Sequence, residues 1–190
     1  MGKIIISENV SLDGVVQDPT GEEGFKHGGW VGQLKDRVEL NKLTLDEMLR
    51  AKALLLGRRS YEFFAARWPS RSGALADRMN SIAKYVVSST LEDPDWDNST
   101  VLNSDVMTDV SKLKQKVNGD VVVLASFQLV HELMEHDLVD GLWLKIFPVV
   151  LGAGGRLFDE TSDKRRMRLV TSEIVDYSVA HLTYERVQDG

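Results

Sequence analysis

Three short polar segments carry the residues best suited to binding chemistry, and each follows an apolar run of strand length. The segments are Gly57–Ser60, Ser88–Thr90 and Ala125–Gln128. Together they offer two guanidinium groups, several hydroxyls and the expected N-termini of two helices. Arginine binds phosphate through paired hydrogen bonds, and a helix N-terminus adds free N–H donors. This combination predicts a site for an anionic dinucleotide rather than for a neutral ligand.

The same residues also allow plainer interpretations. Arg58 and Arg59 suit a solvated pair beside surface carboxylates, because charged side chains are normally exposed. Ser60 suits a helix N-cap with Glu62 nearby. Three acidic residues in or after the N-terminal loop are candidate proton donors, although most such residues only face solvent. They are Asp13, Asp36 and Glu39.

The sequence gives little support for metal binding, cysteine chemistry or a known nucleotide-loop or serine-nucleophile motif. The chain has four histidines, and none has metal-ligand spacing: His131 and His136 lie five residues apart and do not share a helix face. There is no cysteine, which excludes disulfides, thiolate metal sites and a cysteine nucleophile. No P-loop or Gly-x-Ser-x-Gly pattern occurs. We therefore predict that the chain binds no metal.

The elements that must position these segments follow from the apolar periodicity. Val121–Leu124 reads as a strand, Leu129–Met134 as an amphipathic helix, and Leu142–Val150 as a second strand before the glycine-dense turn Gly152–Gly155. In an open parallel sheet, ligands bind at the carboxyl ends of the strands. Strand–helix–strand units also recur in folds with unrelated functions, so this unit alone fits a purely structural role.

The rest of the chain continues the alternation. Lys3–Val10 holds three consecutive isoleucines, as in a strand buried on both faces. Residues 17–33 read as a long loop, of the kind that is functional or mobile. Further strands are predicted at 53–56, 84–88 and 101–102, helices at 36–51, 57–66 and 105–117, and a C-terminal hairpin at 167–187. The expected fold is α/β, one domain over residues 1–190 with a mostly parallel sheet flanked by helices and a C-terminal antiparallel hairpin.

The amino-acid composition and net charge limit the kinds of molecule that this protein is expected to bind. The 190 residues are 43% hydrophobic and 27% charged, which is typical of a globular domain. The net charge of −6 and the isoelectric point near 5.3 argue against nucleic acid or an anionic membrane as the main partner. The polar start of the chain does not suit a signal peptide, and no apolar run approaches the ~20 residues that span a bilayer. We expect a cytoplasmic protein that acts on a small molecule.

Several segments together resemble a known family. They are LLLGRRSYEFFAARWP (54–69), KYVVSSTL (84–91), LVHELMEHDLVDGLWLKIFPVVLGAGGRLF (129–158) and SLDG (11–14) after the first strand. They look like the bacterial dihydrofolate reductase-like proteins related to the C-terminal reductase domain of RibD. The similarity covers nearly the whole chain. It implies a dihydrofolate reductase-like fold, NADPH as cofactor and a homodimer.

The resemblance also implies roles for residues at matching positions. Gly57, Arg58 and Ser60 match the turn that holds the adenosine 2′-phosphate and the pyrophosphate. Ser88 and Ser89 match a second turn, beside the adenosine ribose phosphate. Other positions match the turn along the pyrophosphate (Ala125, Ser126, Phe127, Gln128 and Leu129) and the surroundings of the nicotinamide (Val10 and Val16).

Two positions depart from the family pattern. Ala125 stands where the family usually has glycine, and it adds a Cβ where the backbone must approach phosphate, with the bulky Phe127 beside it. Gly141 stands where a glutamate is common. The motifs identify no carboxylate of the protein that would bind the substrate. Asp36 is the best available candidate for the catalytic acid.

These features lead to two functional hypotheses. The first is an NADPH-dependent reductase of a small heterocyclic or carbonyl substrate, riboflavin-pathway or pterin-like, with the N-terminal loop and Trp30 covering the site. The second is a non-catalytic homodimeric ligand-binding module on the same fold, which the departures at Ala125 and Phe127 favour.

The strand 142–147 also predicts an interface. Side chains alternate along a strand, so Trp143 and Phe147 face away from Leu142 and Leu144. With Val175 and Tyr177 of the hairpin they would form an exposed apolar patch and a two-fold homodimer interface, unless a helix of the same chain covers them.

Overall fold

A single eight-stranded sheet forms the centre of the molecule in the computed structural model, which describes residues 1–34, 36–158 and 164–187. The strand order is β4-β3-β2-β5-β1-β6-β8-β7. The strands are β1 (Lys3–Ser11), β2 (Ala53–Gly57), β3 (Ala83–Val87), β4 (Ser99–Leu102), β5 (Asp120–Leu124), β6 (Gly141–Phe147), β7 (Met167–Val175) and β8 (Val179–Arg186). Strands β1 to β6 pair in parallel, and β8 pairs antiparallel with both β6 and β7.

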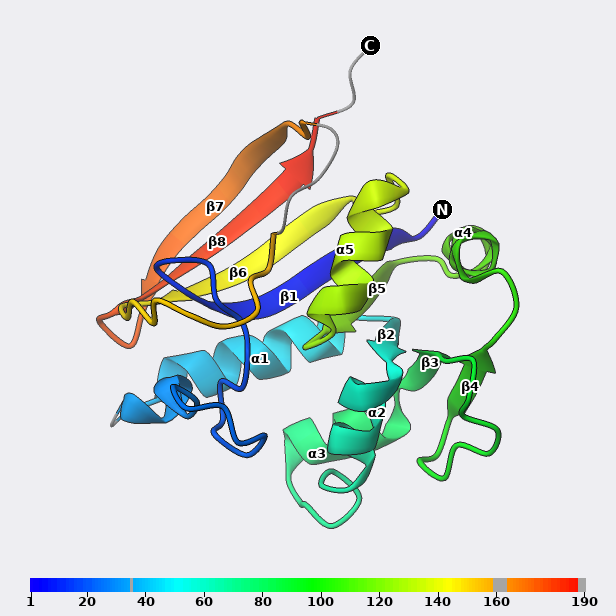
Figure 1. Ribbon diagram of the computed structural model, residues 1–190, viewed down its shortest axis with the longest axis horizontal. Coiled ribbons are helices and arrows are strands. Elements are labelled where there is room, and N and C mark those ends of the chain that lie inside the picture. The colour runs from blue at the N-terminus through cyan, green and yellow to red at the C-terminus, as the bar shows by residue number, and fades with distance from the viewer. Residues whose placement is uncertain (35, 159–163, 188–190) are drawn as a thin grey trace.

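Helices cover both faces of this sheet (Figure 1). They are α1 (Val38–Arg50), α2 (Arg58–Ala65), α3 (Ala74–Ser81), α4 (Val106–Lys116), α5 (Phe127–Glu135) and the short 3-10 helix η1 (Trp30–Gln33). One apolar core joins the sheet to α4 and α5, and a second joins the opposite face to α1, α2 and α3. Consecutive strand residues alternate between these cores: Ile4 and Ile6 belong to the first, and Ile5 belongs to the second.

The predicted fold class is confirmed, with differences at element ends. Strand β6 ends at Phe147 rather than at Val150, because Pro148 has no N–H to donate to a ladder. The segment 72–83, which the sequence describes only as a polar connection with helical character, contains α3. Within the described residues no helix is long and apolar enough to cross a membrane.

The prediction of an exposed apolar patch on β6 is wrong. Trp143 is 6% exposed and Phe147 is 1% exposed, because α1 and η1 of the same chain pack over this face of the sheet. Arg50 of α1 also stacks its guanidinium on the Trp143 ring, 4.9 Å from the ring centroid. In this part of the sheet, exposed apolar side chains occur instead on the edge strand β7 and in the following turn: Leu169, Val170, Ile174 and Tyr177.

Candidate functional site

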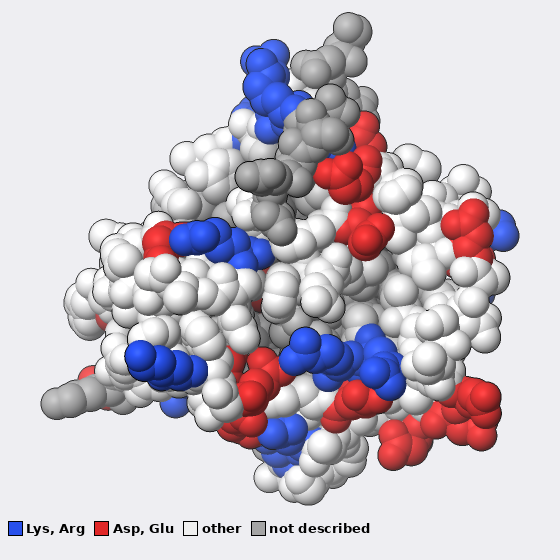
Figure 2. Space-filling model, viewed as in Figure 1, with Lys and Arg blue, Asp and Glu red and all other residues white. Residues whose placement is uncertain are grey.

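A cavity of about 1010 Å³ opens at the carboxyl ends of β2 and β5, beside Ser7, Glu8 and Asn9 of β1. In the space-filling view this face is hollowed near its centre, with basic and acidic side chains around the hollow (Figure 2). The N-termini of α2 and α5, the N-terminal loop and α1 complete the walls. A parallel sheet places ligand sites at this edge, as the sequence predicted.

The turns after β2 and β5 are joined by hydrogen bonds. Gly57 donates its backbone N–H to Ser126 Oγ at 3.0 Å, and Ser126 Oγ donates to the carbonyl of Leu124 at 2.8 Å. Ser60 Oγ donates to the carbonyl of Ala125 at 2.6 Å. Two of the three polar segments therefore form one rigid floor, and Ser60 is bonded across the site rather than capping its own helix.

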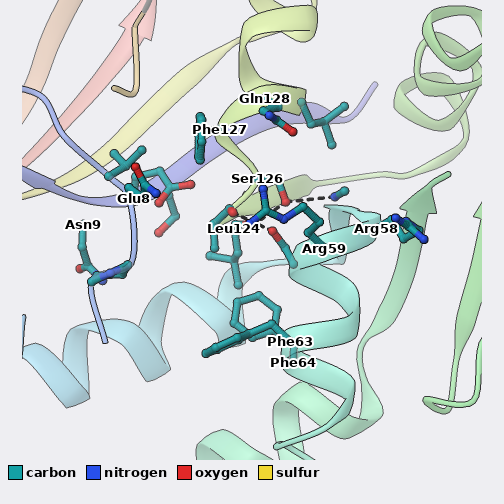
Figure 3. Close-up of a pocket in the computed structure, with 18 of the residues that line it drawn as sticks. Glu8, Asn9, Arg58, Arg59, Phe63, Phe64, Leu124, Ser126, Phe127 and Gln128 are labelled. Atoms are coloured by element: carbon teal, nitrogen blue, oxygen red, sulfur yellow. Dashed lines mark hydrogen bonds between the residues drawn. The ribbon is translucent and has the colours of Figure 1, made fainter. Parts of the chain in front are cut away.

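Ala125 has a backbone conformation that favours glycine. Its φ is 50°, in the left-handed region, where a Cβ is unfavourable. The turn thus keeps the shape expected for the family's glycine, and only a methyl group is added. Phe127 stands beside Glu8, away from the arginines (Figure 3), and its ring packs against Gly155, where an added Cβ would lie 2.8 Å from Phe127 Cζ.

The two arginines lie at the start of α2 and line the cavity (Figure 3). Arg58 forms an ion pair with Glu62 of 3.6 Å, and its side chain is 49% exposed. A half-exposed pair of this kind is weak and leaves guanidinium hydrogens available to an anionic ligand.

The SLDG segment fixes the glycine-dense turn. The Asp13 carboxylate accepts hydrogen bonds from the Ser11 hydroxyl and from the backbone N–H groups of Leu151 and Gly152, which together lower its pKa to about 2. Val16 donates its N–H to the carbonyl of Gly155 at 2.9 Å. Asp13 is therefore a structural acid, and this pairing of loops holds Val16 in the cavity wall.

The cavity includes most of the predicted cofactor positions. Those that line it are Val16, Gly57, Arg58, Ser60, Ala125, Ser126, Phe127, Gln128 and Leu129. Val10 lies instead in the core beside α5. Ser88 and Ser89 lie outside the lining, and Ser88 Oγ accepts the N–H groups of Thr90 and Leu91.

Two expectations for the N-terminal loop do not match its structure. Asp36 is exposed just before α1 and does not line the cavity. Trp30 is 2% exposed and packs edge-on against Phe147 in a separate apolar cluster, so it does not cover the site. The loop contributes Val16, Gln17, Asp18, Pro19, Thr20 and Glu23 to the cavity wall.

Sequence reasoning missed a buried charged cluster at the inner end of the cavity. Lys145 Nζ of β6 lies 2.6 Å from Glu47 Oε2 of α1, and it also donates to Ser7 Oγ at 3.0 Å. Glu47 is 4% exposed and Lys145 is 4% exposed. His181 continues the cluster, with Nε2 3.3 Å from Glu47 Oε1, and reaches Glu173 near the surface through Nδ1 at 2.8 Å.

This cluster sets the charge of its members. Burial raises the pKa of Glu47, but the Lys145 ammonium and the hydrogen bonds from His181, Lys145 and Ser7 outweigh it and leave that pKa below its usual range. The pKa of His181 is raised: burial opposes the rise, and the hydrogen bonds to Glu47 and Glu173 outweigh burial. Glu47 is therefore a carboxylate at neutral pH.

Glu8 lies on the opposite face of β1 from Ser7 and is the second missed acid. It is 6% exposed, it lines the cavity, and its Oε1 has no hydrogen-bond partner. Burial raises its pKa to about 8, although Lys145 and the N–H groups of Ala125 and Ser126 act in the opposite direction. Glu8 is therefore mostly protonated at neutral pH.

A sequence signal for both sites was present. Glu8 and Lys145 interrupt the apolar strands IIISENV and LWLKIF, which the sequence itself predicts to be buried. A charged residue inside such a strand has to be paired, neutralised or functional, because burying a lone charge is costly.

Comparison with known proteins matches this architecture. The model of the RibD C-terminal domain matches residues 2–180. The chain belongs to the RibD C-terminal domain family. The predicted resemblance is thus confirmed, and it spans every element that lines the cavity.

Several relatives and solved structures are similar to this chain over most of its length. Two uncharacterized Bacillus subtilis (strain 168) proteins are similar: YyaP, 25% identical over 96% of this chain and 94% of its own, and YwjB, 23% identical over 88% of each. A putative riboflavin biosynthesis protein from Shewanella sp. PV-4 superposes with a TM-score of 0.76, at 23% identity over 98% of this chain and 99% of its own. Dihydrofolate reductase from Enterococcus faecalis, complexed with NADP(H) and RAB-propyl, gives 0.63 at 17% identity over 98% and 97%. These likenesses establish a dihydrofolate reductase-like fold.

Proposed function

We propose that this protein is an NADPH-dependent reductase of a small heterocyclic or carbonyl substrate, riboflavin-related or pterin-like. Membership of the RibD C-terminal domain family supports an oxidoreductase. The observation that carries the proposal is the pair of arginines beside two linked turns at the N-termini of α2 and α5, over a cavity of about 1010 Å³. Such a site suits a phosphate-bearing dinucleotide, and a nicotinamide bound there would supply a hydride.

The residues present fit this cofactor. Arg58 and Arg59 offer bidentate partners for phosphate oxygens. Ala125 keeps the left-handed turn, and Phe127 lies on the side away from the arginines (Figure 3). In this proposal the arginines and the N-terminal N–H groups of α2 and α5 hold the phosphates, while Val16 and residues 7–9 of β1 border the reacting ring.

The alternative is a homodimeric ligand-binding module that has lost the cofactor. One observation favours it: the N–H of Gly57 and the hydroxyl of Ser60, both candidate phosphate donors, are already bonded to the β5–α5 turn. The arginine side chains are not engaged in that turn, so the reductase remains the better-supported function.

Intrinsic fluorescence separates the two functions. Trp68 lines the cavity, so NADPH binding should quench the emission of the wild type and quench Trp68→Phe much less. Saturable quenching at micromolar cofactor supports the reductase. The absence of binding at millimolar NADPH would leave the binding module as the better account.

We also propose a homodimer, now through β7 rather than β6. Strand β7 is the edge of the sheet and exposes Leu169, Val170 and Ile174. Light scattering on a size-exclusion column should give about twice the 21.3 kDa chain mass, and Ile174→Lys should shift the mass toward the monomer. A wild-type mass near that of one chain at micromolar concentration would refute the dimer.

A further inference from the structure

We propose that Glu8 gives the substrate its proton, and that the substrate is an uncharged planar ring bearing a carbonyl or imine group. This inference rests on the proposed reductase function and assigns the acid and the substrate class of that site. Both parts follow from how the charged and apolar side chains of the cavity are distributed.

Glu8 is built to face a ligand. Its carboxyl is buried between β1 and the turn that begins α5, yet it lines the cavity and stands beside Phe127 (Figure 3). The N–H groups of Ala125 and Ser126 face this carboxyl, whereas Oε1 has no partner in the protein. Native proteins rarely leave a buried polar atom unsatisfied, so an acceptor supplied by a ligand is the natural partner for a neutral carboxyl here.

Among the described residues two other buried acids line the cavity, and neither can play this part. Asp18 is 1% exposed, and its carboxylate accepts the backbone N–H groups of Glu23 and Phe25 within the N-terminal loop. Glu47 accepts hydrogen bonds from Ser7 at 2.8 Å and from Lys145 at 2.6 Å, and both partners stabilise its carboxylate form. It holds no proton to give at neutral pH. Two carboxyl groups whose surroundings separate their protonation states in this way are the usual basis for assigning an acid, and the protonated one is Glu8.

The cavity walls define the substrate class. Between α1, α2 and α3 the lining is apolar and largely aromatic or thioether, which suits a flat ring: Met48, Phe63, Phe64, Trp68, Leu75 and Met79. The charge of Lys145 lowers the pKa of Glu8, but this lysine is already paired with Glu47. Among the described residues, the other lysine or arginine side chains of the lining are Arg58 and Arg59, on the side assigned to the cofactor phosphates. His131 also lines the cavity, with Nε2 3.1 Å from the carbonyl oxygens of Arg156 and Leu157.

Acidic side chains reinforce this choice. Among the described residues, five of them line the cavity: Glu8, Asp18, Glu23, Glu47 and Glu132. Glu8 is neutral and Glu47 is paired with Lys145, but a phosphate on the substrate would still meet Asp18, Glu23 and Glu132. An uncharged ring would instead meet apolar contacts and one hydrogen-bond donor. The structure therefore favours a substrate without phosphate.

The reaction balances with one hydride and one proton. The hydride from the nicotinamide forms a C–H bond at the carbon of the C=O or C=N group. The π electron pair moves to the oxygen or nitrogen, which takes the proton from the Glu8 O–H bond. Glu8 is left as a carboxylate and recovers its proton from water.

The protonation of Glu8 can be measured without cofactor or substrate. With ¹³C-labelled glutamate side chains, one carboxyl resonance should titrate near pH 8, and it should be absent from Glu8→Gln but present in Glu92→Gln. Glu92 is an exposed acid outside the cavity and serves as the matched control. A Glu8 resonance that titrates at the ordinary glutamate value near 4.3 would overturn the assignment.

Binding and kinetics then separate this inference from the proposed function. Glu8→Gln should bind NADPH within about twofold of the wild type, but its hydride-transfer rate should fall about 10²- to 10⁴-fold and lose the decline above pH 8. Glu92→Gln should match the wild type in both. If the wild type does not bind NADPH, the proposed function fails. If NADPH binds and Glu8→Gln keeps its rate, only the role of Glu8 fails.

A matched pair of probes tests the substrate class. Riboflavin and flavin mononucleotide share one planar ring and differ by a phosphate. With NADP⁺ saturating, riboflavin should bind at least tenfold more tightly, as followed by flavin fluorescence. Equal or tighter binding of the phosphorylated probe, or no binding of either, would overturn the class.

Discussion

The two sides of the cavity treat charge in opposite ways. On the α2 side, Arg58 is about half exposed and forms an ion pair with Glu62, 3.6 Å away. At the inner end, Glu47 and Lys145 are each 4% exposed and paired at 2.6 Å, and Glu8 is buried and neutral. On the α2 side, which we call the outer side, the charged group is weakly paired and available to a ligand. At the inner end, each charged group is either paired with an opposite charge or neutralised by protonation.

This difference suits the outer side to ligand binding and the inner end to proton transfer. Exposed cations attract an anion at little cost to folding, since water screens them until the ligand arrives. A buried carboxyl has a raised pKa because burial removes the water that would solvate its charged form. The same burial lowers the folding stability of the protein wherever that group would be charged in the unfolded chain. The largest mutational effects should therefore come from the inner end.

Lys145→Met should produce the largest loss of stability. It removes the ammonium and leaves the Glu47 carboxylate buried with only Ser7 and His181 nearby. Breaking a buried ion pair typically costs about 3–5 kcal/mol. Urea unfolding monitored by circular dichroism at pH 7 measures this loss.

The double variant provides the control for that prediction. Glu47→Gln with Lys145→Met leaves no uncompensated charge, so it should recover most of the stability lost in Lys145→Met. A double variant as unstable as the single one would show that Lys145 contributes through packing rather than through its charge.

Glu8→Gln should change the pH dependence of stability. The folded-state pKa of Glu8 is raised to about 8, so between the ordinary value and 8 the folded chain holds a proton that the unfolded chain has lost. Stability of the wild type therefore falls as pH rises through this window and levels off above pH 8. At about 1.36 kcal/mol per pKa unit, Glu8→Gln should be more stable than the wild type by roughly 3–5 kcal/mol at pH 8.5 and about equal to it at pH 4. Parallel stability curves from pH 4 to 8.5 would contradict a buried neutral Glu8.

Arg58→Ala tests the outer side of the cavity. If its guanidinium binds the 2′-phosphate, the variant should lose about 1.5–3 kcal/mol of NADPH affinity, roughly ten- to a hundredfold, and far less affinity for NADH. Folding stability should change by under about 1 kcal/mol, because the Arg58–Glu62 pair is half exposed. Equal weakening of both cofactors would show that Arg58 does not contact that phosphate.

The sequence predicted the outer side far better than the inner end. Turns after strands, arginines and glycines are local signals, so Gly57, Arg58 and the 125–128 turn could be placed from periodicity alone. The Glu47–Lys145 pair joins residues 98 positions apart, on α1 and β6, and only the packing of that helix over the sheet brings them together. Trp143 and Phe147 were misplaced for the same reason, because alternation along a strand does not show which helix covers it.

Ala125→Gly should produce the smallest effect, and it tests whether the turn between the two sides is strained. A φ of 50° costs a non-glycine residue about 1–2 kcal/mol, while glycine adds back roughly 0.5–1 kcal/mol of unfolded-state entropy. The variant should therefore be more stable than the wild type by up to about 1 kcal/mol. Ala66→Gly is the matched control: Ala66 is exposed with a φ of −68°, so glycine there should destabilise by about 0.5–1 kcal/mol. Chemical denaturation of both variants measures the contrast. Equal destabilisation of both would mean that Ala125 occupies its turn without strain.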